Sequence, residues 1–240
     1  MLPRVLEPEV MDTAEDARDY DAMDHSAVNR LFATDFLALW TGISPVLDVG
    51  TGTAQIPIQI CHQLNDRTVR IVAIDLADHM LALARENVAR AGVGDRVAVE
   101  KADAKRFAYP DGHFGAVISN SIVHHIPEPA ACFAEMHRVC APGGTLFVRD
   151  LLRPADAGTL RKLVDTYAAG ANDHQRKLFA ESLHAALTLD EVRDLIGRLG
   201  YAPGTVRATS DRHWTWGAVR SGGSLTIGQS GNACESGRAL

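Results

Sequence analysis

The chain has 240 residues, of which 46% are apolar and 22% are charged, a composition that suits one α/β domain with its own core. Its formal net charge of -6, without any run of Lys and Arg, argues against nucleic acid as a partner. The acidic first 24 residues and the lack of a long apolar run predict a soluble, cytoplasmic protein with no signal peptide and no membrane span.

Short apolar strands alternate with amphipathic helices along the chain. After an N-terminal helix that ends near residue 42, we expect strands over residues 45–50, 69–74, 97–99, 114–119 and 145–148. The helices between them are expected over residues 53–63, 78–91 and 132–140, with Asp78 as the cap of the second. This alternation predicts a parallel sheet that is covered by helices on both faces.

The last third of the chain departs from this alternation. Residues 154–187 have helical sequence of mixed polarity and are interpreted as a lid insertion. A further helix, capped by Thr188 and ended by Gly200, precedes two strands at 205–208 and 214–219 that we expect to form a hairpin.

The predicted domain therefore covers residues 1–220, with residues 1–42 as an N-terminal cap over the strand ends. Residues 221–240 are rich in Gly and Ser, and we expect them to be a disordered tail. The four cysteines form no CxxC pair, and their spacing fits neither a zinc site nor a disulfide framework.

A glycine turn between the first strand and its helix is the most informative segment, with the sequence Asp48-Val49-Gly50-Thr51-Gly52. Glycine allows positive φ angles and close approach of a ligand, and a helix N-terminus offers free N–H groups. Asp75, at the end of the next strand, stands where a carboxylate can bind a ribose diol. A dinucleotide and S-adenosylmethionine both fit these features.

Two residues favour the second cofactor. A dinucleotide loop takes a small residue at its third position, where this chain has Gln55. Asp48 places a carboxylate just before the loop, which repels a pyrophosphate but suits a cationic amino-acid tail and a sulfonium.

Five segments in the correct order resemble the motifs of class I S-adenosylmethionine-dependent methyltransferases, close to the small-molecule group that includes the ubiquinone/menaquinone methyltransferases. These segments are Asp48 to Gly52, Asp75, Asp103-Ala104, Phe114 to Asn120 and Pro142-Gly143-Gly144. The resemblance implies a Rossmann-like sheet of seven strands, mostly parallel, with a reversed last strand.

The resemblance also implies S-adenosyl-L-methionine as the cofactor. Asp75 would bind both ribose hydroxyls, while Asp103 and the Ala104 N–H would bind the adenine. The full set of candidate cofactor-binding residues is Asp48, Gly50, Thr51, Gly52, Asp75, Leu76, Asp103, Ala104 and Asn120.

The methyl acceptor is expected to be a small molecule held beneath the N-terminal helix and the lid. His124 and His125 resemble a His-His pair that is frequent after the fourth motif, and a neutral imidazole can act as a general base. Tyr20 and Arg149 are candidate substrate contacts, with core packing and a buried ion pair as the structural alternatives. Asn120 alone supplies too few oxygens for a metal, so no metal is expected.

Three other functions stay open at this stage: methylation of RNA or protein, nucleotide-dependent oxidation, and binding without catalysis. Methyltransferases that act on the amino groups of nucleic-acid bases often have an Asn/Asp-Pro-Pro-aromatic fourth motif. The corresponding residues here, Ser119-Asn120-Ser121-Ile122, do not resemble it. Gln55 and Asp48 count against the oxidoreductase, and the intact loop counts against a binding protein. The sequence leaves open the attacked atom and whether the protein is a monomer or a homodimer.

Overall fold

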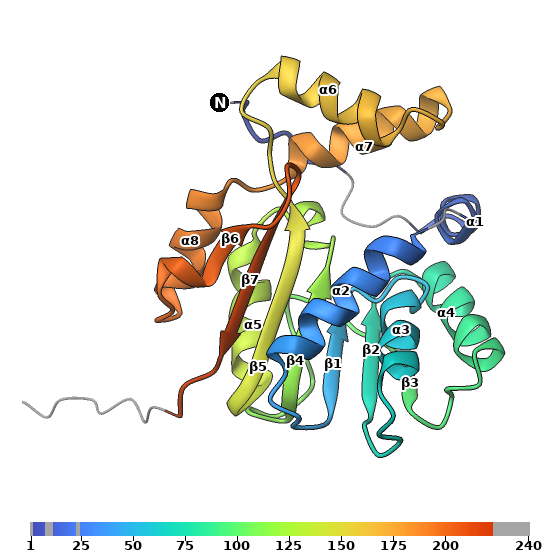
Figure 1. The fold of residues 1–240 in the computed structure, drawn as a ribbon, viewed down its shortest axis with the longest axis vertical. Coiled ribbons are helices and arrows are strands. Elements are labelled where there is room, and N and C mark those ends of the chain that lie inside the picture. The colour runs from blue at the N-terminus through green and yellow to red at the C-terminus, as the bar shows by residue number, and fades with distance from the viewer. Residues whose placement is uncertain (1, 8–11, 23–24, 223–240) are drawn as a thin grey trace, which may run out of the picture.

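The computed structural model describes residues 2–7, 12–22 and 25–222, which form one seven-stranded sheet with helices on both faces (Figure 1). The strands are β1 (Val46–Val49), β2 (Ile71–Asp75), β3 (Val97–Lys101), β4 (Phe114–Asn120), β5 (Cys140–Leu151), β6 (Val206–Ala208) and β7 (His213–Val219). Their order is β3-β2-β1-β4-β5-β7-β6, and β7 runs antiparallel to both of its neighbours. The predicted Rossmann-like fold class is confirmed.

Eight α-helices occur in the described residues: α1 (Ala14–Ala22), α2 (Ser26–Leu39), α3 (Gln55–Gln63), α4 (Asp78–Arg90), α5 (Pro129–Val139), α6 (Ala157–Tyr167), α7 (Asp173–Ala185) and α8 (Leu189–Arg198). One apolar cluster joins α2, α3 and α4 to one face of the sheet, and a second joins α5 and α8 to the other. None of these helices is long and apolar enough to cross a lipid bilayer.

The central strands β1 and β4 are buried because their side chains are apolar on both faces, as a parallel sheet covered by helices requires. All four residues of β1 are buried, and so are the first six of β4. Trp214 and Trp216 alternate along β7 and pack against Phe133 of α5, with ring centroids 6.3 and 5.8 Å apart. Both tryptophans therefore belong to the core.

The sheet order reverses between β1 and β4, whose carboxyl ends point the same way. Ligands bind in α/β sheets at this kind of switch point. Above these ends lie α1 and, in the predicted lid region, α6 and α7 (Figure 1). A small apolar cluster that includes Leu163, Val164 and Leu183 packs α6 against α7.

Three local predictions were wrong. The N-terminal helix is two helices, α1 and α2, on either side of residues 23–24. Asp78 is the first residue of α4, and the residue at the N-cap position is Ala77. The N–H of Ala77 donates to Asp75, and the N–H of His79 donates to Asp12. A cap supplied by Asp12, distant in sequence, leaves no local pattern.

The third difference concerns the fifth strand, which was expected over residues 145–148 after a turn at Pro142-Gly143-Gly144. The observed strand β5 spans Cys140–Leu151 and includes these three residues. A Cβ on Gly144 would lie 2.8 Å from the carbonyl oxygens of Ala141 and Gly115, so the glycine lets the strand pack closely at a register shift. The predicted tail falls mostly on residues 223–240, which lie outside the described residues.

Candidate functional site

A pocket opens at the carboxyl ends of β1, β2, β3 and β4. The side chains and backbone around it are those of Tyr20, Val49, Gly50, Gly52, Ile74, Asp75, Leu76, Ala77, Met80, Ala102, Asp103, Ala104, Lys105, Asn120, Ser121, Ile122, His125 and Ile126. Among the predicted site residues, Tyr20, Gly50, Gly52, Asp75, Leu76, Asp103, Ala104, Asn120 and His125 line this pocket. Asp48, Thr51, His124 and Arg149 are not among the lining residues.

The glycine turn forms the floor of the pocket. Gly50 and Gly52 have φ angles of +72° and +55°, which glycine adopts without a steric penalty. A Cβ on Gly50 would lie 2.1 Å from Cγ2 of Ile122, a distance that no pair of carbon atoms tolerates. Glycine at position 50 therefore lets the turn and the loop after β4 meet at the pocket.

Asp75 holds the turn in place from the end of β2. Its Oδ2 accepts the N–H of Gly52 at 2.8 Å and its Oδ1 accepts the N–H of Ala77 at 3.0 Å. Burial raises the pKa of Asp75, and these two N–H groups act in the opposite direction. A carboxylate oxygen has two lone pairs, so each can still accept a hydrogen bond from a ligand hydroxyl.

Asp48 lies beneath the turn and is 1% exposed. Burial raises its pKa to about 7, the Thr51 hydroxyl opposes this, and the charge of Asp75 adds to it. Its Oδ2 has no hydrogen-bond partner among the described residues. A cationic group brought near this carboxyl would stabilise its charged form.

Asp103 lines the far end of the pocket at the end of β3. Its Oδ1 accepts the N–H of Lys105 at 2.9 Å and lies 3.1 Å from the Lys105 Nζ. Partial burial works to raise the pKa of Asp103, but the Lys105 N–H and ammonium together lower it. Asp103 is therefore charged at neutral pH.

Tyr20 of α1 lies over the turn and is 37% exposed, and a Cβ on Gly52 would be 3.6 Å from its ring. Its neighbour Asp21 ties α1 to the domain, because its Oδ1 accepts hydrogen bonds from Gln55 Nε2 at 3.2 Å and Asn87 Nδ2 at 2.8 Å. Gln55, the residue that departs from a dinucleotide loop, thus holds α1 across the pocket.

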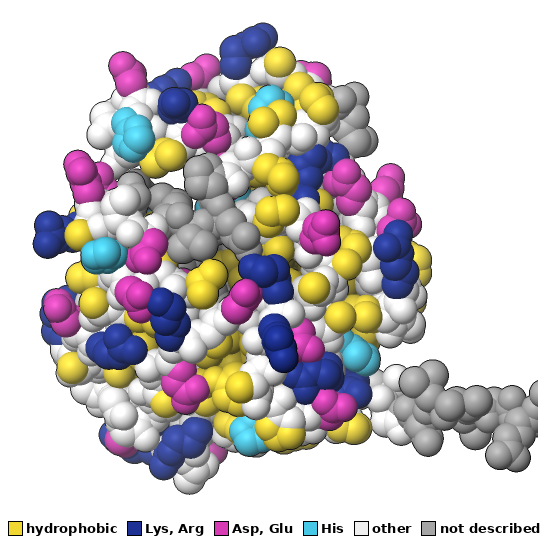
Figure 2. Space-filling model, turned by 180° about the vertical axis from the view of Figure 1, so that it is seen from behind, with side chains coloured by type: hydrophobic (Ala, Val, Ile, Leu, Met, Phe, Trp, Pro, Cys, Tyr) yellow, Lys and Arg dark blue, Asp and Glu magenta, His cyan; other side chains and the backbone are white. Residues whose placement is uncertain are grey.

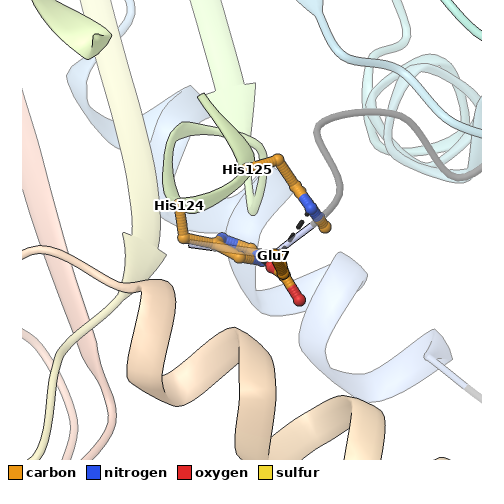
Figure 3. Close-up of side chains that lie close together, drawn as sticks. All are labelled: Glu7, His124 and His125. Carbon is orange, nitrogen blue, oxygen red and sulfur yellow. Dashed lines mark ion pairs between the residues drawn. The ribbon is translucent and has the colours of Figure 1, made fainter. Parts of the chain in front are cut away.

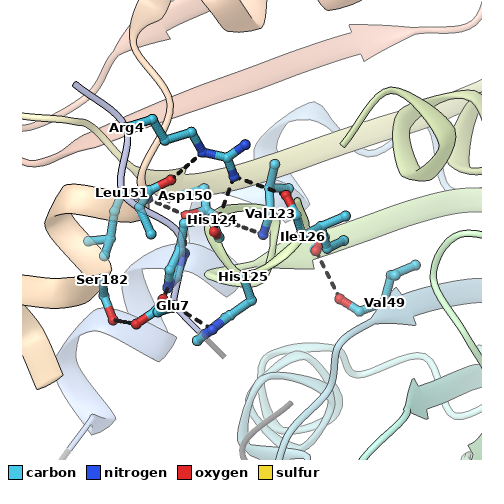
Figure 4. Close-up of polar contacts among 12 residues, drawn as sticks. Arg4, Glu7, Val49, Val123, His124, His125, Ile126, Asp150, Leu151 and Ser182 are labelled. Carbon is cyan, nitrogen blue, oxygen red and sulfur yellow. Dashed lines mark hydrogen bonds and ion pairs between the residues drawn. The ribbon is translucent and has the colours of Figure 1, made fainter. Parts of the chain in front are cut away.

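The two candidate histidines lie on a short 3₁₀ turn, Val123–His125, and their rings lie side by side, with centroids 4.1 Å apart (Figure 4). His124 is buried, with its Nδ1 2.5 Å from Oδ1 of Asp150, while Oδ2 of Asp150 accepts the N–H of Val123 at 2.6 Å. Burial alone would lower the pKa of His124, but the Asp150 carboxylate raises it above its ordinary value. His125 borders the pocket.

Glu7 completes this cluster and was not predicted. Its Oε1 lies 3.1 Å from Nδ1 of His125 and 3.5 Å from Nε2 of His124 (Figure 3), and its Oε2 accepts the Ser182 hydroxyl of α7 at 3.0 Å. Burial raises the pKa of Glu7, and the neighbouring His124 opposes this. Glu7 comes from an irregular N-terminal segment, so no sequence periodicity marks it.

Arg149 lies away from the pocket on the α2 side of the sheet. Its Nη2 lies 2.6 Å from Oδ2 of Asp35, its Nε donates to Thr215, and its guanidinium lies over the rings of Phe32 and Phe147. Every one of these contacts is structural. The face of the molecule seen in Figure 2 carries basic, acidic and apolar side chains interspersed with one another.

A family described as "Methyltransferase domain" matches residues 46–144, the segment from β1 into β5. The chain is 29% identical over 212 residues to the 27-O-demethylrifamycin SV methyltransferase of Amycolatopsis mediterranei, with 84% of this chain and 71% of that protein covered.

It is also 30% identical over 115 residues to the ubiquinone/menaquinone biosynthesis C-methyltransferase of Geobacter sulfurreducens, covering 48% of this chain and 44% of that protein. The chain thus spans less than half the length of this second relative. A crystal structure of an S-adenosyl-L-methionine-dependent methyltransferase from Methanococcus maripaludis superposes with a TM-score of 0.66 at 16% identity, covering 92% of this chain and 99% of that one.

Proposed function

We propose that this chain methylates a hydroxyl oxygen of a small molecule, with S-adenosylmethionine as the methyl donor; its residues 46–144 match a methyltransferase domain. The pocket at the β1–β4 switch point carries this proposal: Asp75 and Asp103 line it, and the buried Asp48 lies beneath its glycine turn. The alignment with an O-methyltransferase supports the choice of atom, because it extends beyond the domain to 84% of the chain.

The residues around the turn fit S-adenosylmethionine. Asp48 has a buried oxygen with no partner, which suits the ammonium of a methionine tail. Asp75 keeps lone pairs for a ribose diol, and Asp103 stands at the opposite end of the pocket for the adenine. When bound, this cofactor supplies a methyl group on a positively charged sulfur.

The chain itself orients the reactants and excludes water. Gly50 and Ile122 close the floor, and Tyr20 lies across the opening on a helix that Asp21 ties down. Alignment of two reactants in a closed site accounts for a large part of the rate of a group transfer. We assign α6 and α7 and the N-terminal residues to the acceptor side of the site.

A hydroxyl acceptor must lose its proton as the new oxygen–carbon bond forms. His125 is the imidazole that borders the pocket, and Glu7 lies behind its Nδ1. We assign the acceptor to the part of the pocket that His125 lines. There the hydroxyl proton of the acceptor passes to the pair formed by His125 and Glu7. His124 is a positioning residue, because its contacts with Asp150 and Glu7 are buried.

Isothermal titration calorimetry tests the cofactor. S-adenosylmethionine and S-adenosylhomocysteine are expected to bind with micromolar dissociation constants, and NAD is expected not to bind. Asp75→Ala should abolish binding, whereas Asp66→Ala, which removes an exposed acid before the same strand, should leave it unchanged. Binding of NAD in place of the other two would overturn the proposal.

The acceptor is tested by release of S-adenosylhomocysteine with a panel of hydroxylated small molecules, matched thiols and amines, and a transfer RNA. Turnover with a hydroxyl compound alone is expected. His125→Gln should lower kcat for that compound at least about a hundredfold while the affinity for S-adenosylhomocysteine stays unchanged. Turnover of the RNA or of an amine, with none for hydroxyl compounds, would replace the proposed acceptor.

A further inference from the structure

The cluster of Glu7, His124 and His125 presents three metal-ligating atoms to one point (Figure 3). Oε1 of Glu7 lies 3.5 Å from Nε2 of His124 and 3.1 Å from Nδ1 of His125, and the three atoms all lie within 4.8 Å of one another. In a tetrahedral site with metal–ligand distances of about 2.0–2.1 Å, neighbouring ligand atoms are about 3.3 Å apart. The two shorter separations fall on either side of that value.

The groups behind these ligands also match a metal site. Nδ1 of His124 faces Oδ1 of Asp150 at 2.5 Å, so a proton on Nδ1 leaves Nε2 with its lone pair toward Glu7. A metal-bound histidine commonly donates its other N–H to a carboxylate in this way. The Ser182 hydroxyl donates to Oε2 of Glu7, which turns Oε1 toward the two imidazoles.

We propose that Glu7, His124 and His125 bind one divalent transition-metal cation of the zinc type. Two imidazoles and one carboxylate are the three protein ligands of many zinc enzymes, and their fourth position stays open. The carboxylates of Glu7 and Asp150 balance the double charge of the cation.

This cation would bind the acceptor oxygen, because His125 is the ligand that borders the pocket. A zinc ion lowers the pKa of a bound hydroxyl, so with the cation in place the acceptor would release its proton to water and not to His125 and Glu7, which would then be metal ligands. That role rests on the proposed function, whereas the binding of the cation does not. The site also joins the N-terminal segment, residues 2–7, to the loop after β4.

Calorimetric titration of the EDTA-treated full-length protein with Zn²⁺ tests the proposal. A Cys234→Ser background removes the one thiol that lies outside the described residues. We expect one Zn²⁺ per chain, with an affinity that falls at least about tenfold in Glu7→Gln and in His125→Gln. His79→Asn is the matched control, because His79 pairs with Asp12 at 3.0 Å but has no second imidazole, and it should bind Zn²⁺ normally.

Cobalt supplies a second measurement. Co²⁺ in this site should give visible d–d bands without the near-ultraviolet thiolate band that a cysteine ligand produces, and both variants should lose the visible bands. Absence of a one-to-one Zn²⁺ complex, or an unchanged affinity in Glu7→Gln and His125→Gln, would overturn the site. S-adenosylhomocysteine is titrated into the same samples. If it binds while Zn²⁺ does not, the metal site is wrong and the proposed function stands; if it does not bind, the proposed function fails independently of the metal.

Discussion

Nδ1 of His124 lies 2.5 Å from Oδ1 of Asp150, and both residues are buried, at 4% and 1% exposure. Asp150 also accepts the N–H groups of Val123 and Leu151, which with His124 lower its pKa although burial works to raise it. The pair therefore joins the end of β5 to the turn that carries both histidines. Its geometry determines where His125 meets the pocket.

Removal of this buried charge should be costly. Asp150→Asn removes the nearer of the two carboxylates that face His124 and is expected to lower the free energy of unfolding by about 3 kcal/mol. Urea denaturation at neutral pH measures the change. The control is Asp78→Asn, because Asp78 pairs with Lys101 at 2.5 Å on the surface and should contribute less than about 1 kcal/mol. Equal effects of the two substitutions would contradict the interpretation.

The raised pKa of Asp48 predicts a pH dependence of stability. Its ordinary value is 3.8 and the folded value is about 7, so between these pH values the native state holds a proton that the unfolded chain has lost. This group therefore destabilises the fold progressively as the pH rises from about 4 to about 7. Asp48→Asn removes the effect, so the variant should gain stability relative to the wild type between pH 5 and pH 8.

Urea denaturation at both pH values checks this prediction. Asp19→Asn, at an exposed position of α1, should show the same difference from the wild type at pH 5 and at pH 8. A difference for Asp48→Asn that stays constant with pH would show that its carboxyl titrates normally in the folded protein.

The contact between Gly50 and Ile122 makes Gly50 intolerant of any side chain. In Gly50→Ala the new methyl would overlap Ile122 Cγ2 at 2.1 Å, so the turn must move and binding of S-adenosylhomocysteine should weaken at least about a hundredfold. Gly92→Ala has a similar φ of +66° but no atom within 4 Å, and should cost about 1 kcal/mol of stability without affecting binding. Calorimetry and urea denaturation distinguish the two. If Gly50→Ala and Gly92→Ala bound S-adenosylhomocysteine with similar affinity, the contact between Gly50 and Ile122 would not limit the residue at position 50.

Arg149 is expected to act on stability and not on the substrate. Arg149→Lys keeps a positive charge but loses the Nε donor to Thr215 and the planar group over Phe32 and Phe147, so the free energy of unfolding should fall by about 1–2 kcal/mol. Steady-state kinetics with a hydroxyl acceptor that the panel of compounds identifies should give an unchanged KM. A raised KM with normal stability would return Arg149 to the substrate site.

The sequence predicts the pocket well where the evidence is local. Gly50 and Gly52 follow the buried strand β1, Asp75 ends β2 and Asp103 follows β3, and parallel strands bring such positions to one edge of the sheet. Tyr20 and His125 also line the pocket. Their roles in binding and catalysis stay predictions.

Contacts between distant segments could not be predicted in the same way. Glu7 bonds Ser182, 175 residues further along the chain, and neither residue belongs to a motif. The partners of Arg149 come from α2 and β7, so only the packed sheet distinguishes this arginine from a substrate contact. The neighbours His124 and His125 both reach Glu7, but His124 also pairs with the buried Asp150 whereas His125 borders the pocket, a difference that the sequence does not indicate.

Arg4 has a consequence for the order of folding. Its guanidinium donates to the carbonyl oxygens of His124, Ile126 and Pro127 and to that of Ala185, which is 181 residues away in the chain. A ribosome makes Arg4 long before Ala185, so this set of bonds cannot be complete until Ala185 has emerged. The central strands β1 to β5 are all synthesised before that point, so the sheet can assemble while the acceptor side of the pocket still lacks its N-terminal wall.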